Sequence, residues 1–129
     1  MMRISKRAQY GLRAMVFLAK NYRQGKIASV KTISKKEGIP FEFLEKIVLQ
    51  FEKAKLVKGK KGVSGGYILS KSPKKINAND VVSVLEKSKK TVDCSFCGRK
   101  TKCATKDVWS KLNKALSNTL KSITLAELI

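Results

Sequence analysis

The first half of the chain alternates between apolar stripes at helical spacing and short polar breaks. Residues 5–22 carry apolar side chains every three or four positions, which predicts a helix that ends at Gln24. Ser29 is a typical helix N-cap and Gly38 a typical stop, so a short second helix is expected between them. A longer helix is expected from Pro40 onward, because its apolar positions form one stripe. These positions are Phe43, Leu44, Ile47, Val48 and Phe51.

The pattern changes after Lys55. Two short segments rich in β-branched, aliphatic and aromatic residues, LVKG and YILS, are joined by the basic, glycine-rich loop KKGVSGG. They predict a β-hairpin with one of the longer loops. A helix, a short helix, a turn, a longer helix and a hairpin follow one another in a winged helix-turn-helix. We therefore expect a mostly α-helical fold with a small β-hairpin wing.

Two more helices are expected after the hairpin. Asn77 or Asn79 can cap the first, with Asp80 in its first turn. The second carries a long apolar stripe, which predicts a dimerisation helix because little of a small subunit is left to cover it. The alternative is that the stripe covers the subunit's own core. Thr124 and Glu127 form a capping-box pattern, which predicts a last short helical turn. The stripe consists of Val108, Trp109, Leu112, Leu116, Leu120 and Ile123.

Charge is the strongest bulk property of the chain. Its 29 lysines and arginines against nine acidic residues give a net charge of +20, without any histidine. This excess favours a polyanionic partner such as nucleic acid, although a lysine-rich surface without such a partner is the alternative. The apolar part of the N-terminal segment is interrupted by Arg13 and Lys20, so we expect a mature, cytoplasmic protein. We expect no enzyme, since neither a nucleotide fingerprint nor a paired-carboxylate pattern is present.

Charged residues of the longer helix and the hairpin are candidate DNA contacts. The N-terminal residues of a recognition helix face base edges, and here they are Glu42, Glu45 and Lys46. Glu45 can accept a hydrogen bond from cytosine N4, and Lys46 can donate to guanine or to a phosphate. Lysines and glycines in the hairpin suit a close approach to the DNA backbone. The hairpin candidates are Lys58, Lys60, Lys61 and Ser64.

All three cysteines lie in the stretch DCSFCGRKTKC, as Cys94, Cys97 and Cys103. Such close spacing lets thiolates share one metal centre, and the surrounding basic residues favour the thiolate form. An iron–sulfur cluster needs these thiolates and one further donor. A structural zinc ion, with no histidine in the chain, needs an oxygen donor or a second chain. A thiol redox switch forms one disulfide and leaves one cysteine over, and a segment that binds nothing is the remaining alternative.

These motifs, in this order, resemble the IscR/NsrR-like family of winged-helix iron–sulfur transcription regulators. The resemblance covers nearly the whole chain and includes MRISKRAQYGLRAM, ISKKEGIPFEFLEKI, KAKLVKGKKGVSGGYILS, INANDVVSVLE and VWSKLNKALSNTLKSITLAELI. It implies a homodimer that binds palindromic promoter DNA, mostly as a repressor. It also implies a [2Fe-2S] or [4Fe-4S] cluster on the three cysteines, which senses iron–sulfur status, redox state or nitric oxide. A zinc- or thiol-based cytoplasmic nucleic-acid-binding protein without a cluster is the alternative.

The resemblance also assigns roles to single positions and regions. It implies that Glu45 and Lys46 contact bases and that Lys61 occupies a wing position usually held by arginine. We divide the chain into a winged helix-turn-helix DNA-binding region, residues 1–76, and a cysteine-loop sensor and dimerisation region, residues 77–129.

The chain departs from the family at the fourth cluster ligand. Its cysteine spacing is C-x2-C-x5-C in place of C-x5-C-x5-C, and Lys106 stands where IscR-like members have a ligating histidine. In NsrR-like members an acidic residue from the partner's first helix is the fourth ligand, and the corresponding residue here is Gln9. The fourth ligand is therefore open between Asp93, Asp107, the partner's Gln9 and a small exogenous ligand.

Overall fold

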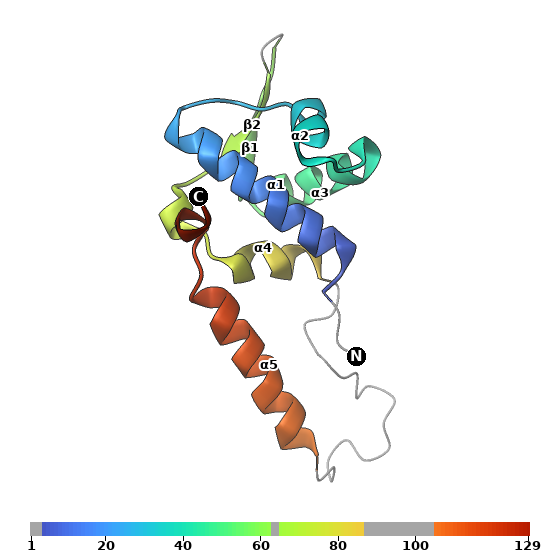
Figure 1. Ribbon diagram of the computed structural model, residues 1–129, viewed down its shortest axis with the longest axis vertical. Helices are drawn as coiled ribbons and strands as arrows, with labels where there is room; N and C mark the ends of the chain where they lie inside the picture. The colour runs from blue at the N-terminus through green and yellow to red at the C-terminus, as the bar shows by residue number, and fades with distance from the viewer. Residues whose placement is uncertain (1–3, 63–64, 87–104) are drawn as a thin grey trace.

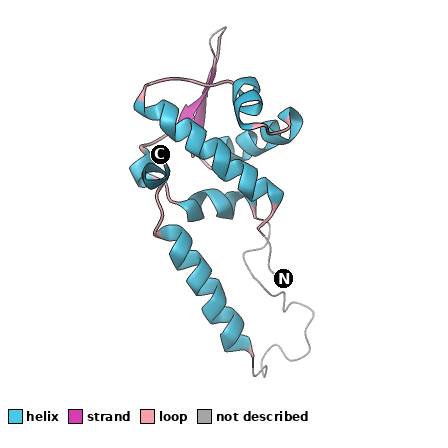
Figure 2. Cartoon of the chain, viewed as in Figure 1, coloured by secondary structure: helices cyan, strands magenta, loops and turns pink. Residues whose placement is uncertain are grey.

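The computed structural model describes residues 4–62, 65–86 and 105–129 of the 129-residue chain. Within these residues the fold is mostly α-helical with one two-stranded antiparallel hairpin, as the sequence predicts (Figures 1 and 2). The helices are α1 (Lys6–Arg23), α2 (Val30–Glu37), α3 (Phe41–Lys53), α4 (Ala78–Leu85) and α5 (Lys106–Lys121). The strands are β1 (Val57–Lys60) and β2 (Gly66–Leu69), and the short 3-10 turns are η1 (Pro73–Lys75) and η2 (Leu125–Leu128).

The helix ends follow the local chemistry of the sequence. The Ser29 side chain accepts a hydrogen bond from the Thr32 amide at 3.1 Å and caps α2, and Gly38 ends this helix with φ of +66°. Asn77 rather than Asn79 caps α4. Its side chain accepts from the Asp80 amide at 2.8 Å, while the Asp80 carboxylate accepts from the Asn77 amide at 3.1 Å. This reciprocal pair satisfies two of the amides that a helix start leaves unpaired.

The predicted capping box before η2 is wrong in its side-chain part. The short turn forms, but the Thr124 side chain makes no capping hydrogen bond. The backbone of Thr124 instead pairs with Asn77 in an antiparallel bridge, and the Leu125 amide donates to the Ile76 carbonyl at 2.9 Å. Pairing with a distant segment has taken the place of the local cap, and it brings the C-terminus against the start of α4.

The hairpin is fixed to the helix-turn-helix at its base. Val57 lies opposite Leu69 in the antiparallel register. Beyond this pairing, the Ala28 amide donates to the Tyr67 carbonyl at 3.1 Å, and the Tyr67 amide donates to the Ala28 carbonyl at 2.7 Å. A Cβ on Gly66 would lie 2.5 Å from the Ala28 carbonyl carbon, so this close approach requires glycine. The strands project from this base away from α4 and α5 (Figure 1).

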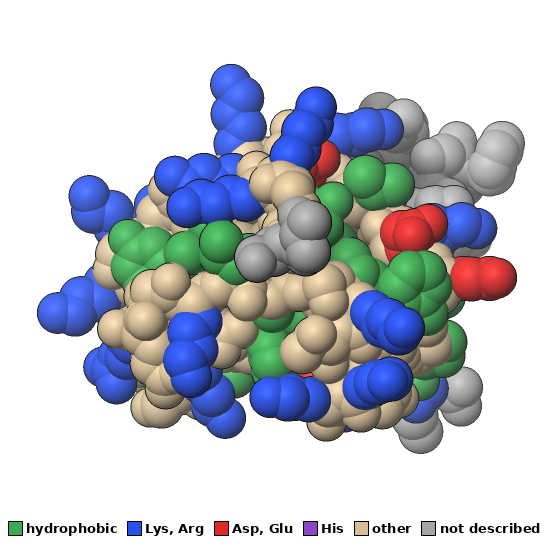
Figure 3. All heavy atoms as spheres, turned by 90° about the horizontal axis from the view of Figure 1, so that it is seen from above, with side chains coloured by type: hydrophobic (Ala, Val, Ile, Leu, Met, Phe, Trp, Pro, Cys, Tyr) green, Lys and Arg blue, Asp and Glu red, His purple; other side chains and the backbone are tan. Residues whose placement is uncertain are grey.

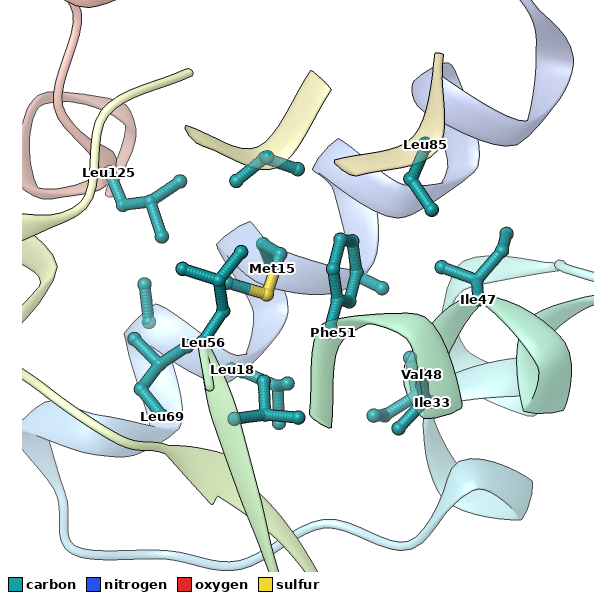
Figure 4. Close-up of a cluster of buried hydrophobic side chains, with 14 of the residues drawn as sticks. Met15, Leu18, Ile33, Ile47, Val48, Phe51, Leu56, Leu69, Leu85 and Leu125 are labelled. Atoms are coloured by element: carbon teal, nitrogen blue, oxygen red, sulfur yellow. The ribbon is translucent and has the colours of Figure 1, made fainter. Parts of the chain in front are cut away.

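One apolar core joins the helices and the hairpin (Figure 4). Met15 of α1 and Phe51 of α3 are fully buried in it, and Leu125 of η2 closes one side. α1 and α4 approach closely at Gly11, where a Cβ would lie 2.2 Å from Leu85 Cδ1. The orientation of α1 therefore depends on both α3 and α4. No helix in the described part of the chain has the length and apolar character needed to cross a membrane.

Candidate DNA interface and sensor segment

α3 buries one side and exposes the other. Its apolar stripe packs into the core, with Phe43 half-buried beside it. Glu42, Glu45 and Lys46, the predicted base-contacting residues, are all exposed. These residues face solvent, while the opposite side of the helix packs against the core. They can therefore contact a ligand without disturbing the core. The buried side consists of Leu44, Ile47, Val48 and Phe51.

α1 holds the turn between α2 and α3. The Arg13 guanidinium donates a hydrogen bond to the Glu37 carbonyl and also pairs with the Glu37 carboxylate, with 3.7 Å between Nε and Oε1. The Tyr10 and Phe43 rings meet edge to face, with centroids 5.6 Å apart and planes at 84°. An exposed ion pair contributes at most about 1 kcal/mol. The aromatic contact and the packing of the buried stripe therefore do most to fix the orientation of α3.

The hairpin presents its lysines to solvent. Lys58, Lys60 and Lys61 are all exposed, while Ser64 lies outside the described residues. Gly62 has φ of +122°, a conformation that glycine adopts far more readily than other residues. The chain can therefore turn directly after the lysines, which leaves their side chains at the surface.

Tyr67 joins the hairpin to α3, a relationship that the sequence alone does not reveal. A Cβ on Gly59 of β1 would lie 3.0 Å from Glu52 Oε2 and 3.3 Å from the Tyr67 ring. Burial raises the pKa of the Tyr67 phenol, and the negative charges of Glu52 and Glu45 raise it further. The phenol therefore stays protonated to a higher pH than the phenol of an ordinary tyrosine. In the sequence, Tyr67 counts only as a residue that favours strands.

α2 adds basic residues that were not among the predicted contacts. Lys31, Lys35 and Lys36 are all exposed on this helix. Figure 3 views the molecule from the hairpin end, where lysine and arginine side chains surround the face and acidic side chains lie mainly toward the side of α2 and α3. The sequence feature that indicates these contacts is the presence of three lysines in the short helix VKTISKKE.

α5 leaves part of its apolar stripe exposed in the described subunit. None of its residues is buried, and it extends away from the rest of the fold (Figure 1). Val108 is 55% exposed and Leu116 is 42% exposed. Leu120, near the end of the helix, does pack against the core. The C-terminal end of α5 therefore covers the subunit's own core, which was the alternative prediction for this stripe. The exposed residues Val108 and Leu116 do not. Trp109, Leu112 and Ile123 are half-buried.

The cysteine segment is flanked by two helices in the sequence. Cys94, Cys97, Cys103 and Asp93 all fall in residues 87–104, outside the described residues. α4 ends at Leu85, shortly before this segment, and α5 begins at Lys106, shortly after it. The segment thus connects a helix of the core to the helix with the partly exposed stripe.

Two candidate fourth ligands belong to the described residues. Asp107 is exposed in the first turn of α5, where a negative charge also stabilises the helix start. Gln9 is exposed on α1, and its side-chain nitrogen donates to the Ile4 carbonyl at 2.8 Å. The amide oxygen of Gln9 is the atom that could act as a ligand. Among the described residues, no three His, Cys, Asp or Glu side chains gather as a metal site would require.

Comparison with known proteins places the whole chain among transcriptional regulators. The model of the Rrf2 family, described as an iron-dependent transcriptional regulator, matches residues 4–129. The chain is 31% identical over 132 residues to the protein rrf2 of Nitratidesulfovibrio vulgaris, covering 99% of this chain and 87% of that protein. It is also 31% identical over 131 residues to the HTH-type transcriptional regulator IscR of Klebsiella pneumoniae, covering 99% and 80%.

Solved structures with this fold include two of more than 30% identity. One is T. potens IscR, which is 34% identical with a TM-score of 0.81, covering 98% of this chain and 85% of that chain. The other is CymR of B. subtilis, described as the global cysteine regulator, which is 32% identical with a TM-score of 0.84 and covers 99% and 96%. The likeness extends over α5 and the C-terminus as well as the winged helix-turn-helix.

Proposed function

The chain belongs to the Rrf2 family of transcriptional regulators, and on this basis we propose that it is a homodimeric repressor controlled by an iron–sulfur cluster. It is a DNA-binding transcription regulator and not an enzyme, because the family model describes a transcriptional regulator and the IscR relatives are regulators. The observation that carries the DNA-binding part of this proposal is that the predicted contact residues of α3 and the lysines of the hairpin are all exposed, on two elements that pack against one core. We infer that it acts in the cytoplasm, where its promoter DNA lies.

We assign the protein–DNA contacts by element. The exposed side of α3 enters the major groove, with Glu45 accepting from cytosine and Lys46 donating to guanine or a phosphate. Glu42 lies at the start of the same side. The hairpin lysines neutralise phosphates and reach the adjacent minor groove. Lys61 does so as a point charge, without the planar fork of an arginine. The exposed lysines of α2, the helix that crosses the backbone in such motifs, add further phosphate contacts.

We assign dimerisation to α5. The exposed part of the stripe, which includes Val108 and Leu116, suits a second copy of the chain, because burial of such side chains is the main favourable term in association. In a symmetric dimer the two α3 helices then meet half-sites about one helical turn of DNA apart. The division into residues 1–76 for DNA and 77–129 for sensing and dimerisation follows from this assignment.

The cysteine segment fits an iron–sulfur cluster by the chemistry of its donors. Thiolates are the usual ligands of such clusters, and Cys94, Cys97 and Cys103 would supply three of them. The fourth donor would come from Asp93, Asp107, the partner's Gln9 or a small exogenous ligand. A bound cluster supplies sensitivity to iron–sulfur status, redox state or nitric oxide. Because the segment joins α4 to α5, a change in it acts on the core and on the dimer contact together.

Anaerobic purification tests the cluster directly. We expect a brown protein with visible absorption, iron and acid-labile sulfide, and expect serine at any of the three cysteines to lose these signals. The matched control is Ser110→Cys on α5, which adds a thiol outside the segment and should not change the iron content. A colourless protein with stoichiometric zinc, or with three titratable thiols, would contradict the cluster.

A thiol-based regulator without a cluster is the second candidate. It is favoured by the similarity to CymR of B. subtilis, which is described as a cysteine regulator. In this case two of the three cysteines form a disulfide under oxidation, and DNA binding follows the thiol state. Thiol titration of colourless protein before and after mild oxidation, with DNA affinity measured alongside, separates the two candidates.

A further inference from the structure

Phe41 is an aromatic side chain that the fold leaves at the surface of α3. It is the first residue of the helix and is 44% exposed. Phe43, only two positions further, packs against the core and the Tyr10 ring. Phe41 is not among the side chains that pack against this core in the described part of the chain. A single exposed apolar residue needs no explanation by itself, so its place on the helix decides its significance.

That place is the side of α3 assigned to DNA. Phe41 and Glu45 are spaced four residues apart and are both exposed, so they lie on the same side of the helix. Phe41 stands one turn before Glu45, toward the N-terminal end. Residues at this end of a recognition helix are the ones that reach base edges. An apolar group there meets the floor of the major groove.

We propose that Phe41 reads the 5-methyl group of a thymine in the major groove. The inference rests on the proposed DNA-binding function and names a specificity determinant within it. The thymine methyl is the apolar feature of the major groove, and phenylalanine is among the side chains that contact it. The charged neighbours of Phe41 on α3 have no such apolar surface to offer.

The helix geometry sets the distance between the two readouts. One α-helical turn advances about 5.4 Å. Stacked base pairs are about 3.4 Å apart. With Glu45 on a cytosine, Phe41 therefore reaches a thymine one or two base pairs away. Each half-site of the operator should contain this thymine and cytosine combination.

Methyl deletion in the DNA tests the contact. The operator is first selected from random-sequence DNA with the wild-type protein, and each thymine is then replaced by deoxyuridine, one position of the half-site at a time. One replacement should weaken wild-type binding about fourfold, the effect expected for one buried methyl-sized group. The same replacement should leave the affinity of Phe41→Ala unchanged, and Phe41→Leu should respond partially. Because Phe41 is exposed, circular dichroism and thermal unfolding should match the wild type.

Leu49→Ala is the matched control. Leu49 is 45% exposed on the same helix, two turns further from the N-terminal end. This variant should keep the wild-type response to deoxyuridine. An operator without any sensitive thymine, or equal sensitivity in wild type and Phe41→Ala, overturns the inference. So does a Phe41→Ala protein that binds the operator normally but no longer represses, since Phe41 would then contact a protein. Failure to select any preferred sequence contradicts the proposed function instead.

Discussion

The Glu86 carboxylate accepts two hydrogen bonds from Ser5, a residue 81 positions earlier in the chain. The Ser5 amide lies 2.9 Å and its hydroxyl 2.7 Å from Glu86 Oε1. The same hydroxyl accepts from the Ala8 amide at 3.1 Å and so caps α1. The first turn of α1 has no acidic residue of its own, so Glu86 supplies the negative charge that a helix start favours. Glu86 directly precedes the cysteine segment, so this contact ties the segment's beginning to α1.

The first prediction concerns this contact. Ser5→Ala removes the cap of α1 and one partner of Glu86, and should lower the free energy of unfolding by about 1–2 kcal/mol. Glu86→Gln keeps an acceptor but loses the charge, so its loss should be smaller. Urea unfolding followed by circular dichroism measures both. Equal stability of wild type and Ser5→Ala would show that the contact contributes nothing.

The second prediction concerns the hairpin lysines. Operator affinity should fall steeply with salt, because lysine contacts to phosphates release counterions. Alanine at Lys58, Lys60 or Lys61 should each reduce the slope of log affinity against log salt by about 1, while the preferred sequence stays the same. Fluorescence anisotropy over a range of salt concentrations gives the slope. Lys121→Ala on α5 is the control and should keep the wild-type slope. A slope that none of the hairpin substitutions alters would remove the wing from the interface.

The third prediction concerns pH and Tyr67. Its pKa is raised in the folded protein, first by burial and then by the charges of Glu52 and Glu45. A raised pKa means that the contribution of this group to stability is present below the ordinary tyrosine value of about 10 and is lost as pH rises through the folded value. Tyr67→Phe should therefore lose less stability than wild type over this alkaline interval. Absorbance titration of tyrosinate should show that Glu52→Gln lowers the Tyr67 pKa. An unchanged titration curve in Glu52→Gln would contradict the assigned proximity.

The fourth prediction concerns α5. Leu116→Glu places a charge in the middle of the proposed dimer contact and should shift the protein to monomer in analytical ultracentrifugation. Subunit folding should persist, because Leu116 is 42% exposed within the subunit. Asn118→Glu introduces the same charge on the opposite side of the helix and should leave the dimer intact. If both variants sediment like wild type, α5 does not form the dimer contact.

The local elements could be predicted from the sequence because their determinants are local. Ser29 and Gly38 bracket α2 as their chemistry requires, and the apolar stripe of α3 is buried as its spacing predicts. The sequence alone does not decide between Asn77 and Asn79 as the cap of α4, because both residues are able to cap a helix. The reciprocal bond with Asp80 accompanies Asn77 alone. The winged helix-turn-helix and the exposed side of α3 could also be predicted from such local patterns.

By itself, the sequence determined the helices, the hairpin, the net charge and the three clustered cysteines. Periodicity and capping act over a few residues and can be read from the order of the chain. The tertiary structure decided that Glu86 meets Ser5, that Thr124 pairs with Asn77 instead of capping η2, and that Glu52 lies beside Tyr67. These contacts join segments far apart in sequence, and their geometry depends on how the core orients α1, α3 and α4. No local pattern encodes that orientation, because it results from packing all the apolar faces together.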